Sequence, residues 1–274
     1  MIPIEPITPI TSREYKMMLK AEVFAGKSHA VETALEKFRD AVRDTTDLEV
    51  RGDFELDKKQ EVRFWDLPDH WLYKKQNYVL RTRKRNDKTS LTLKCRHGDR
   101  YFVQSRIVIA EDAKFEEDLK PRFTHLFSYS RKSEKERPKD VDALIDLFPD
   151  LKNRMGEPPA DARFESVREF VASERVYSGL KVELSESFDA ECAVVVWYDG
   201  NEGDDETPVV AEFSFRYPRK KWCKKPPAEP HNAFDGSTGL VAHDFYTALQ
   251  DSSALKENWL DPQSKTKTRF AYEG

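Results

Sequence analysis

The sequence is poor in cysteine and glycine, with 3 Cys and 10 Gly among 274 residues. Cys95, Cys192 and Cys223 are odd in number and far apart, so they predict neither a disulfide framework nor a metal site. This usage favours a reducing compartment. The six histidines show no H-x-x-x-H spacing, and G-K-S at 26–28 lacks the upstream glycine of a phosphate-binding loop.

Long hydrophobic runs are also absent. No apolar stretch reaches the length of about 18 residues that a membrane helix needs. The first residues, MIPIEPITPI, carry no basic segment of the kind that starts a signal peptide. We therefore expect a cytoplasmic protein without a membrane span. The net charge of −4 gives no overall attraction to nucleic acid, so any anion site must come from local clustering.

Aromatic and charged residues are plentiful. The chain is 38% hydrophobic, 35% charged and 12% aromatic, and that many aromatic residues exclude a disordered chain. Its length allows one large domain or two small ones. We expect a single domain over 1–274.

Residues 78–96 predict two short strands, 78–85 and 90–96, joined by a polar turn, with most of the charge on one face. Residues of the same parity in a strand point to the same side of the sheet, which places the following side chains on one face: Arg81, Arg83, Arg85, Thr92, Lys94 and Arg96. Neighbouring cations repel each other, so such a face is either bathed in water or binds a multiply charged anion. The residues alone leave both interpretations open.

The rest of the chain predicts an α+β protein. Alternation predicts strands at 15–24, 60–66, 101–109, 175–184, 191–198 and 208–217, with a closing strand at 264–272. Helical periodicity predicts a helix over 28–43, capped by Ser28, and a last helix over 238–250. Residues 111–170 are rich in charge and predict a helical insertion, with helices near 114–127, 139–148 and 161–172. The charge runs at 131–140 and 220–225 are typical of solvated loops, with partner or RNA binding as the alternative.

Several short motifs follow one another in a recognisable order. They are Phe64-Trp65-Asp66, Leu80-Arg81-Thr82-Arg83, Leu91-Thr92-Leu93-Lys94 and, later, Ala211-Glu212-Phe213-Ser214. In this order they resemble the CYTH superfamily of triphosphate tunnel proteins. That superfamily includes class IV adenylyl cyclases, thiamine triphosphatases, inorganic triphosphatases and fungal-type RNA triphosphatases. The resemblance implies an eight-stranded antiparallel β-barrel with flanking helices.

The resemblance also implies a site inside that barrel. The expected ligand carries a triphosphate group and is a nucleotide, inorganic triphosphate or an RNA 5′ end. The resemblance does not indicate an oligomeric state. The residues expected to bind it are Arg81, Arg83, Lys94 and Arg106, followed by Arg85, Lys20 and Arg216. Hydrolysis in this family needs Mg²⁺ or Mn²⁺, hard cations that prefer carboxylate oxygens. The expected ligands of that metal are Glu22, Glu183 and Glu212, with Glu212 as the catalytic residue.

The sequence departs from the family pattern in its acidic residues. The first strand of the family presents two glutamates and a lysine, whereas this chain offers Met18, Lys20 and Glu22. An alternative register gives Glu14, Lys16 and Met18. The fifth strand has Gln104 and Arg106 where the family usually has acids, and the late pair is Glu212 and Ser214. We therefore expect ligand binding with weak or absent triphosphate hydrolysis, and the alternative is a non-catalytic protein that senses an anion or binds a partner.

Overall fold

The computed structural model describes residues 10–106, 113–186, 188–200, 207–218 and 236–274. Its strands are β1 (Ser12–Leu19), β2 (Val50–Arg51), β3 (Glu55–Asp66), β4 (Tyr78–Arg85), β5 (Lys88–His97), β6 (Lys114–Lys120), β7 (Thr124–Ser133), β8 (Glu165–Ser185), β9 (Phe188–Asp199) and β10 (Pro208–Pro218). Its α-helices are α1 (Ser28–Arg43), α2 (Trp71–Gln76), α3 (Arg100–Ser105), α4 (Val141–Leu147), α5 (Gly236–Asp251), α6 (Ser253–Asn258) and α7 (Lys267–Glu273). None of the helices in these ranges is both long enough and apolar enough to cross a membrane.

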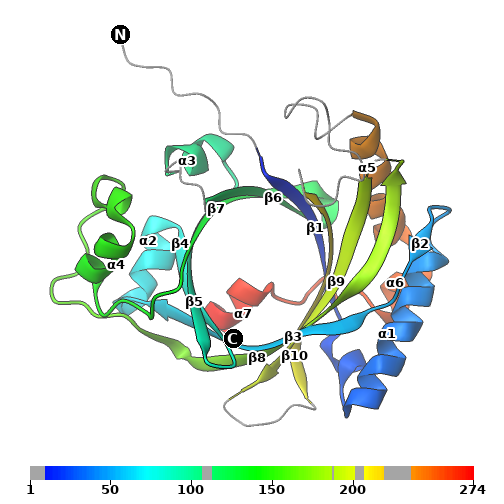
Figure 1. The fold of residues 1–274 in the computed structure, drawn as a ribbon, viewed down its shortest axis with the longest axis horizontal. Coiled ribbons are helices and arrows are strands. Elements are labelled where there is room, and N and C mark those ends of the chain that lie inside the picture. Colours follow the sequence, from blue (N-terminus) through cyan, green and yellow to red (C-terminus); the bar gives the residue numbers. More distant parts are fainter. Residues whose placement is uncertain (1–9, 107–112, 187, 201–206, 219–235) are drawn as a thin grey trace. The chain divides into compact units, whose positions relative to one another are not determined.

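The described strands form one sheet that closes on itself. They are hydrogen-bonded in the order β2-β8-β3-β4-β5-β7-β6-β1-β10-β9, and β9 also pairs with β8. Nine strands therefore make a ring, and β2 lies outside it (Figure 1). An odd number of strands cannot alternate in direction all the way round, so at least one neighbouring pair is parallel. The predicted α+β barrel is confirmed, but it has nine strands and is mixed.

Most of the predicted elements are present. The helix expected at 28–43 is α1, and the first strand of the hairpin is β4 with the expected bounds. The strands expected at 60–66, 90–96, 175–184, 191–198 and 208–217 lie within β3, β5, β8, β9 and β10. The helices near 139–148 and 238–250 are α4 and α5.

Six local predictions are wrong. The strand expected at 15–24 ends at Leu19, and a 3-10 helix follows from Ala21 to Phe24. Residues 101–105 form α3, because Asp99 caps its first turn by accepting the backbone N–H of Tyr101 at 2.8 Å; residues 107–109 lie outside the described part. The expected helix at 114–127 is the β6–β7 pair, and the one at 161–172 falls largely within β8. The closing strand at 264–272 is instead an extended segment followed by α7, and the cap of α1 is Lys27 rather than Ser28.

The chain divides into two compact units, each described here by itself. The first contains residues 62–118 and 125–170, and the second contains residues 12–61, 119–124 and 171–274, within the described ranges. Within its described residues, the insertion expected at 111–170 is helical at α4, at the 3-10 helix Pro149–Asn153 that follows it and at the short 3-10 helix Pro121–Phe123 between β6 and β7. A single domain over 1–274 stays a prediction.

The core of the first unit lies on one face of the β4–β5 hairpin. Tyr78 and Leu80 in β4 and Leu93 and Cys95 in β5 are buried there, and Leu144 of α4 packs into the same cluster. Helices α2 and α4 lie on this side of the hairpin (Figure 1). Burying these apolar side chains stabilises the unit and commits the opposite face of β4 and β5 to the polar residues.

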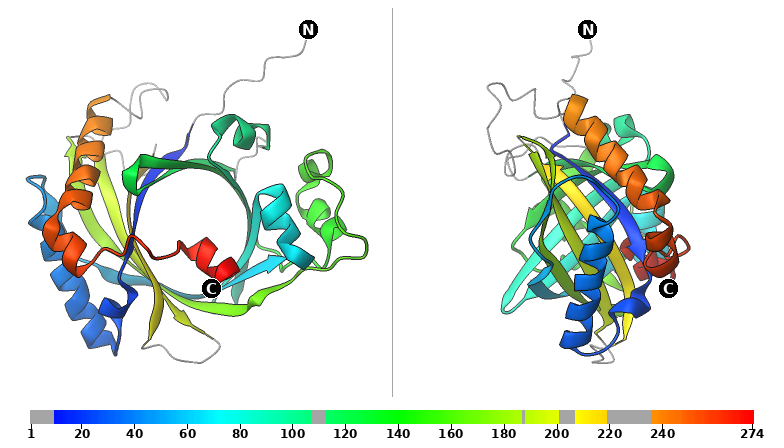
Figure 2. Two further views of the ribbon diagram at one scale, coloured as in Figure 1. Left: turned by 180° about the vertical axis from the view of Figure 1, so that it is seen from behind. Right: turned by 90° about the vertical axis from the view of Figure 1, so that its right-hand side faces the viewer.

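The core of the second unit lies between β1, β9 and β10 and the helices α1 and α5, which cover one face of these strands (Figure 2). Phe38 of α1 contacts the ring of Phe213 edge-on, and Tyr15 of β1 stacks on Phe215 at 4.6 Å between ring centroids. On the opposite face, β1 and β10 carry mostly polar residues, whereas β9 adds Val195 and Trp197 beside Glu191.

Candidate functional site

The β4–β5 hairpin carries its cations on one face, as predicted. Residues directly opposite each other in an antiparallel pair lie on the same face. Arg81 lies opposite Thr92 and Arg83 opposite Ser90, whereas Leu80 lies opposite Leu93 in the core. The alternation seen in the sequence therefore holds across both strands.

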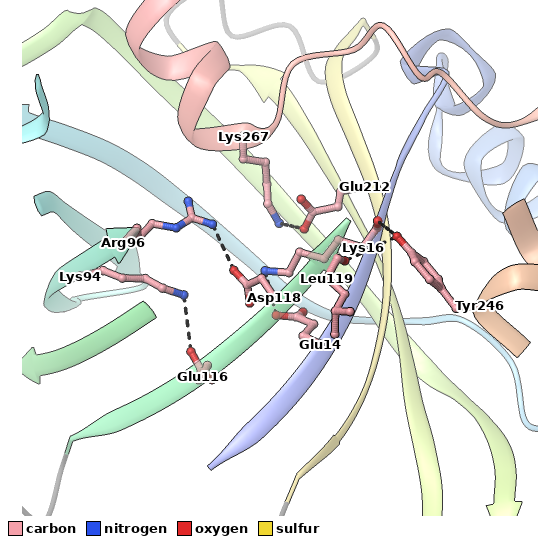
Figure 3. Close-up of polar contacts among 10 residues, drawn as sticks. All are labelled: Glu14, Lys16, Lys94, Arg96, Glu116, Asp118, Leu119, Glu212, Tyr246 and Lys267. Atoms are coloured by element: carbon pink, nitrogen blue, oxygen red, sulfur yellow. Dashed lines mark hydrogen bonds and ion pairs between the residues drawn. The ribbon is translucent and has the colours of Figure 1, made fainter. Parts of the chain in front are cut away.

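Strands β7 and β6 extend this face. Lys132 of β7 lies opposite Thr92. The ammonium of Lys94 lies 3.5 Å from the carboxylate of Glu116 in β6, and the guanidinium of Arg96 lies 3.1 Å from Asp118 (Figure 3). Phe115, between Lys114 and Glu116, packs instead into the core of the unit. We call this four-strand surface the basic face; its charged residues are Arg81, Arg83, Lys94, Arg96, Lys114, Lys132, Glu116 and Asp118.

The basic face has a marked excess of positive charge. Among its described residues, six cations stand against two carboxylates, which leaves four positive charges. The pKa of Lys132 is lowered, first by partial burial and then by the cations Lys114, Arg83 and Arg81. A lysine whose neighbours disfavour its charge becomes easier to protonate when an anion arrives. The face is therefore electrostatically suited to an anion.

A hydroxyl group adds a hydrogen-bond donor to the same face. Ser128 lies opposite Arg96 and is completely buried. Its Oγ has no hydrogen-bond partner within the described part of the chain. A buried hydroxyl without a partner is costly in a folded protein, and an anion oxygen at this face would supply the missing acceptor.

The aromatic–Asp motif has a structural role. The carboxylate of Asp66 is buried and accepts three backbone N–H groups, from Leu67 and Leu72 at 2.7 Å each and from Tyr73 at 3.0 Å. It thereby satisfies the first turn of α2 and fixes the end of β3. The indole of Trp65 donates to the hydroxyl of Thr82 at 2.9 Å on the core side of the hairpin.

In the second unit, the polar face of β1, β9 and β10 carries matched ion pairs. Glu14 and Lys16 of β1 lie 2.9 Å apart, and Arg216 of β10 donates to Glu191 of β9 at 3.0 Å. Glu212, opposite Met18, is buried and lies 2.8 Å from the ammonium of Lys267 in α7 (Figure 3). These contacts follow the alternative register of the first strand, in which Glu14, Lys16 and Met18 share a face.

The three expected metal ligands do not converge. Glu22 is exposed on the 3-10 helix after β1. Glu183 lies 3.3 Å from Arg51 of β2, and Glu212 is paired with Lys267. Within the described ranges, no group of three or more His, Cys, Asp or Glu residues is placed to hold a metal ion. The donor set therefore does not fit the Mg²⁺ or Mn²⁺ that the resemblance implies.

Several expected ligand-binding cations lie elsewhere. Arg106 follows α3, with its guanidinium over the rings of Tyr78 and Phe102 on the core side of the hairpin, so its expected place on a strand at 101–109 is wrong. Lys20 follows the end of β1 and donates to the backbone carbonyl of Glu257. Arg216 is engaged by Glu191. Arg85, by contrast, shares the parity of Arg81 and Arg83, as expected, but is exposed at the end of β4.

The sequence reasoning missed the contribution of β6 and β7. The run KFEEDLK was assigned to a helix because of its charge density, although its alternation places Phe115, Glu117 and Leu119 on one side and Lys114, Glu116 and Asp118 on the other. A period of two was the available signal. It also missed Glu174, a buried carboxylate that accepts the indole N–H of Trp197 at 2.8 Å and the amide of Gln60 at 2.6 Å.

No protein-family model and no curated protein matches the sequence. Solved structures do resemble it. A protein from Hippeastrum, named as a candidate adenylyl cyclase with a dominant triphosphatase activity, gives a TM-score of 0.40 at 14% identity, covering 94% of this chain and 93% of that one. A candidate adenylate cyclase from Bacillus halodurans gives 0.38 at 14% identity, with 95% and 99% covered. A Pyrococcus horikoshii protein gives 0.31 at 12% identity, with 86% and 89% covered.

The closed ring of strands fits the triphosphate tunnel fold. At these levels of likeness, no residue role passes from those proteins to this chain. What the side chains can do has to come from their own geometry.

Proposed function

We propose that the basic face binds a ligand that carries a polyphosphate group, and that it does so in the cytoplasm. The observation that supports this most directly is the charge on four neighbouring strands, six cations against two carboxylates in the described part of the first unit. A polyphosphate carries several negative charges because each of its phosphates is ionised near neutral pH. Nucleoside triphosphates, inorganic triphosphate and an RNA 5′ end share this chemistry.

The residue types suit the parts of such a ligand. Arg81 and Arg83 present planar guanidinium groups that hold phosphate oxygens by paired hydrogen bonds, and Lys94 acts as a point charge. The hydroxyl of Ser128 offers a neutral donor beside them. Because Arg81, Arg83 and Lys94 are only partly exposed, their contacts are less screened by water and salt than those of a freely exposed cluster.

We further propose that binding, rather than turnover, is the main activity. Hydrolysis of a polyphosphate needs its charge offset and a water molecule oriented, which carboxylate-bound metal ions commonly do. Glu14, Glu116, Asp118, Glu191 and Glu212 are instead each paired with a lysine or an arginine. The proposed role is therefore a binding or sensing protein on a triphosphate tunnel fold, with weak metal-dependent hydrolysis as the second candidate.

The test is a comparison of ligand-induced stabilisation among variants. Tripolyphosphate should raise the melting temperature of the wild type, because a ligand that binds only the folded state stabilises it. Arg81→Ala, Arg83→Ala and Lys94→Ala should each weaken binding by about tenfold to a hundredfold, since a charge-assisted hydrogen bond contributes about 1.5–3 kcal/mol. Lys84→Ala is the matched control: Lys84 is exposed and lies on β4 with the opposite parity. Equal stabilisation of all four variants would contradict the proposal.

A further inference from the structure

The C-terminal helix α7 places a lysine against a buried glutamate. Glu212 lies in β10, and its side chain leaves the strand on the face opposite Phe213 and Phe215, which belong to the core. The carboxylate is 6% exposed, and the ammonium of Lys267 lies 2.8 Å from it. Figure 3 shows the lysine reaching from the start of α7 to this carboxylate.

Helix α7 depends on its docking. It has seven residues, and a helix that short does not persist alone in water. The segment that precedes it is tied to the end of β1: the N–H of Asp261 donates to the carbonyl of Met18 at 3.0 Å, and the N–H of Lys20 donates to Trp259 at 2.8 Å. One side of the helix is then buried through Thr268, Ala271 and Tyr272. Lys267 is therefore held in place.

The neighbouring carboxylates on this face are matched in the same way. Glu14 is paired with Lys16 of the same strand, β1. Glu191 of β9 is paired with Arg216 of the neighbouring strand β10. A divalent cation at Glu212 would have to displace an ammonium, because Lys267 already lies beside the carboxylate. A buried carboxylate needs a positive partner, and here the chain itself provides one.

We propose that Lys267 supplies to Glu212 the positive charge that a divalent cation would otherwise supply, and that the protein takes its polyphosphate ligand free of metal. The role of Lys267 rests on the second unit alone. The statement about the ligand rests on the proposed function. The two parts are therefore tested separately, the first without any phosphate present.

The first experiment measures whether the lysine replaces a metal. In Lys267→Met, Glu212 loses its resident cation, and millimolar Mn²⁺ should raise the melting temperature of this variant but not that of the wild type. The double variant Lys267→Met with Glu212→Gln should not respond, because the carboxylate is gone. Arg269→Met is the matched control on the same helix, since Arg269 is exposed and pairs with Glu273. Wild type and Lys267→Met responding equally to Mn²⁺ would overturn the proposal.

A second measurement needs no variant and so does not depend on Lys267→Met folding. Hydrogen exchange of the α7 amides in the wild type should be unchanged by millimolar Mn²⁺, because the metal does not displace Lys267. Faster exchange in α7 on addition of Mn²⁺ would show that metal and lysine compete for Glu212, and it would overturn the proposal.

The ligand part is tested by calorimetric titration of the wild type with tripolyphosphate, once with EDTA and once with excess Mg²⁺. We expect binding in EDTA to be at least as tight as in Mg²⁺, because complexation lowers the charge of the ligand. Binding that appears only with Mg²⁺ would overturn this part. Absence of binding in both buffers would instead contradict the proposed function, and the Mn²⁺ experiments would still decide the role of Lys267.

Discussion

The guanidinium of Arg96 in β5 lies 3.1 Å from the carboxylate of Asp118 in β6, and the Asp118 side chain has no exposed surface. Arg96 is 20% exposed, so the acid is the more deeply buried half of the pair. Removing the arginine takes a close cation away from a fully buried carboxylate, whereas removing the acid affects a cation that reaches water. The two halves of this ion pair should therefore contribute unequally to stability.

We expect Arg96→Met to lower the free energy of unfolding by about 3–5 kcal/mol, the usual cost of breaking a buried ion pair from one side. Asp118→Asn should cost clearly less. Urea unfolding followed by circular dichroism measures both, with Arg85→Met as the control because Arg85 is exposed at the end of β4. The prediction is contradicted if Asp118→Asn lowers the free energy of unfolding as much as Arg96→Met or more, because hydration of Arg96 would then not reduce the cost.

Binding of an anion to the basic face should be coupled to proton uptake by Lys132. Its pKa is lowered by partial burial and by the cations around it, so at alkaline pH part of the free protein lacks this proton. A bound polyphosphate favours the charged form and draws the proton back. Affinity should therefore fall as the pH rises through the lowered pKa of Lys132.

The measurement is tripolyphosphate titration near pH 9 in two buffers of different ionisation enthalpy. The wild type should take up more protons per bound ligand than Lys132→Met, and protons released or taken up by the ligand itself cancel in that comparison. Equal uptake by the two proteins would remove Lys132 from the site.

The Asp66 carboxylate should matter for stability rather than for ligand binding. Asp66→Ala leaves three buried N–H groups without an acceptor, at about 1–3 kcal/mol each. We expect a loss of at least about 3 kcal/mol in the free energy of unfolding. Asp57→Ala, at an exposed position of the same strand, is the control and should change it little. Loss of tripolyphosphate binding at a temperature where Asp66→Ala is still folded would point to a direct role instead.

The thiols of Cys95 and Cys192 should resist alkylation in the native protein. Both are buried, and burial raises the pKa of Cys95 to about 12 and raises that of Cys192 as well. The reactive species is the thiolate, so peptide mapping after iodoacetamide treatment at pH 8 should find both unmodified until denaturant is added. Rapid native labelling of Cys95 would contradict its burial.

The raised pKa of Cys95 also makes the stability of the protein depend on pH. The contribution of the buried neutral thiol to the free energy of unfolding is lost as the pH rises above 9.0.

The parts of the basic face that could be predicted from the sequence are those with a clear local periodicity. The β4–β5 hairpin was predictable because arginine and leucine alternate cleanly, and each alternation assigns a face. Strand β6 was not recognised because Glu116, Glu117 and Asp118 are acidic on both faces, which hides the period of two. Glu117 is buried on the far side and pairs with His125 at 2.7 Å, a tertiary contact that no local pattern reveals.

The pairing of Glu212 was beyond local reasoning for a different reason. Lys267 lies 55 positions further along the chain, and the residues around it, KTKTRFAY, favoured a closing strand by their β-branched and aromatic content. The segment from Lys267 is helical instead, because burying one side of α7 against the unit stabilises the helix more than the weak local preference favours a strand. The acid that looked like a metal ligand is thus held by a cation whose position depends on the whole unit.

The last prediction concerns catalysis. We expect tripolyphosphate hydrolysis by the wild type, with Mg²⁺ or Mn²⁺ added, to be far below the ~10 s⁻¹ typical of enzymes. A metal that must offset the charge of the phosphates and orient water needs two or more converging carboxylates. Each of the following acids is instead paired with a lysine or an arginine: Glu14, Glu116, Asp118, Glu191 and Glu212. Phosphate release measured over hours will report any residual rate. If such a rate exists, Glu212→Gln should abolish it while leaving the stabilisation by tripolyphosphate largely intact. A wild-type rate near the typical value would mean that carboxylates and metal come together in a way that the ion pairs of Glu14, Glu191 and Glu212 do not suggest.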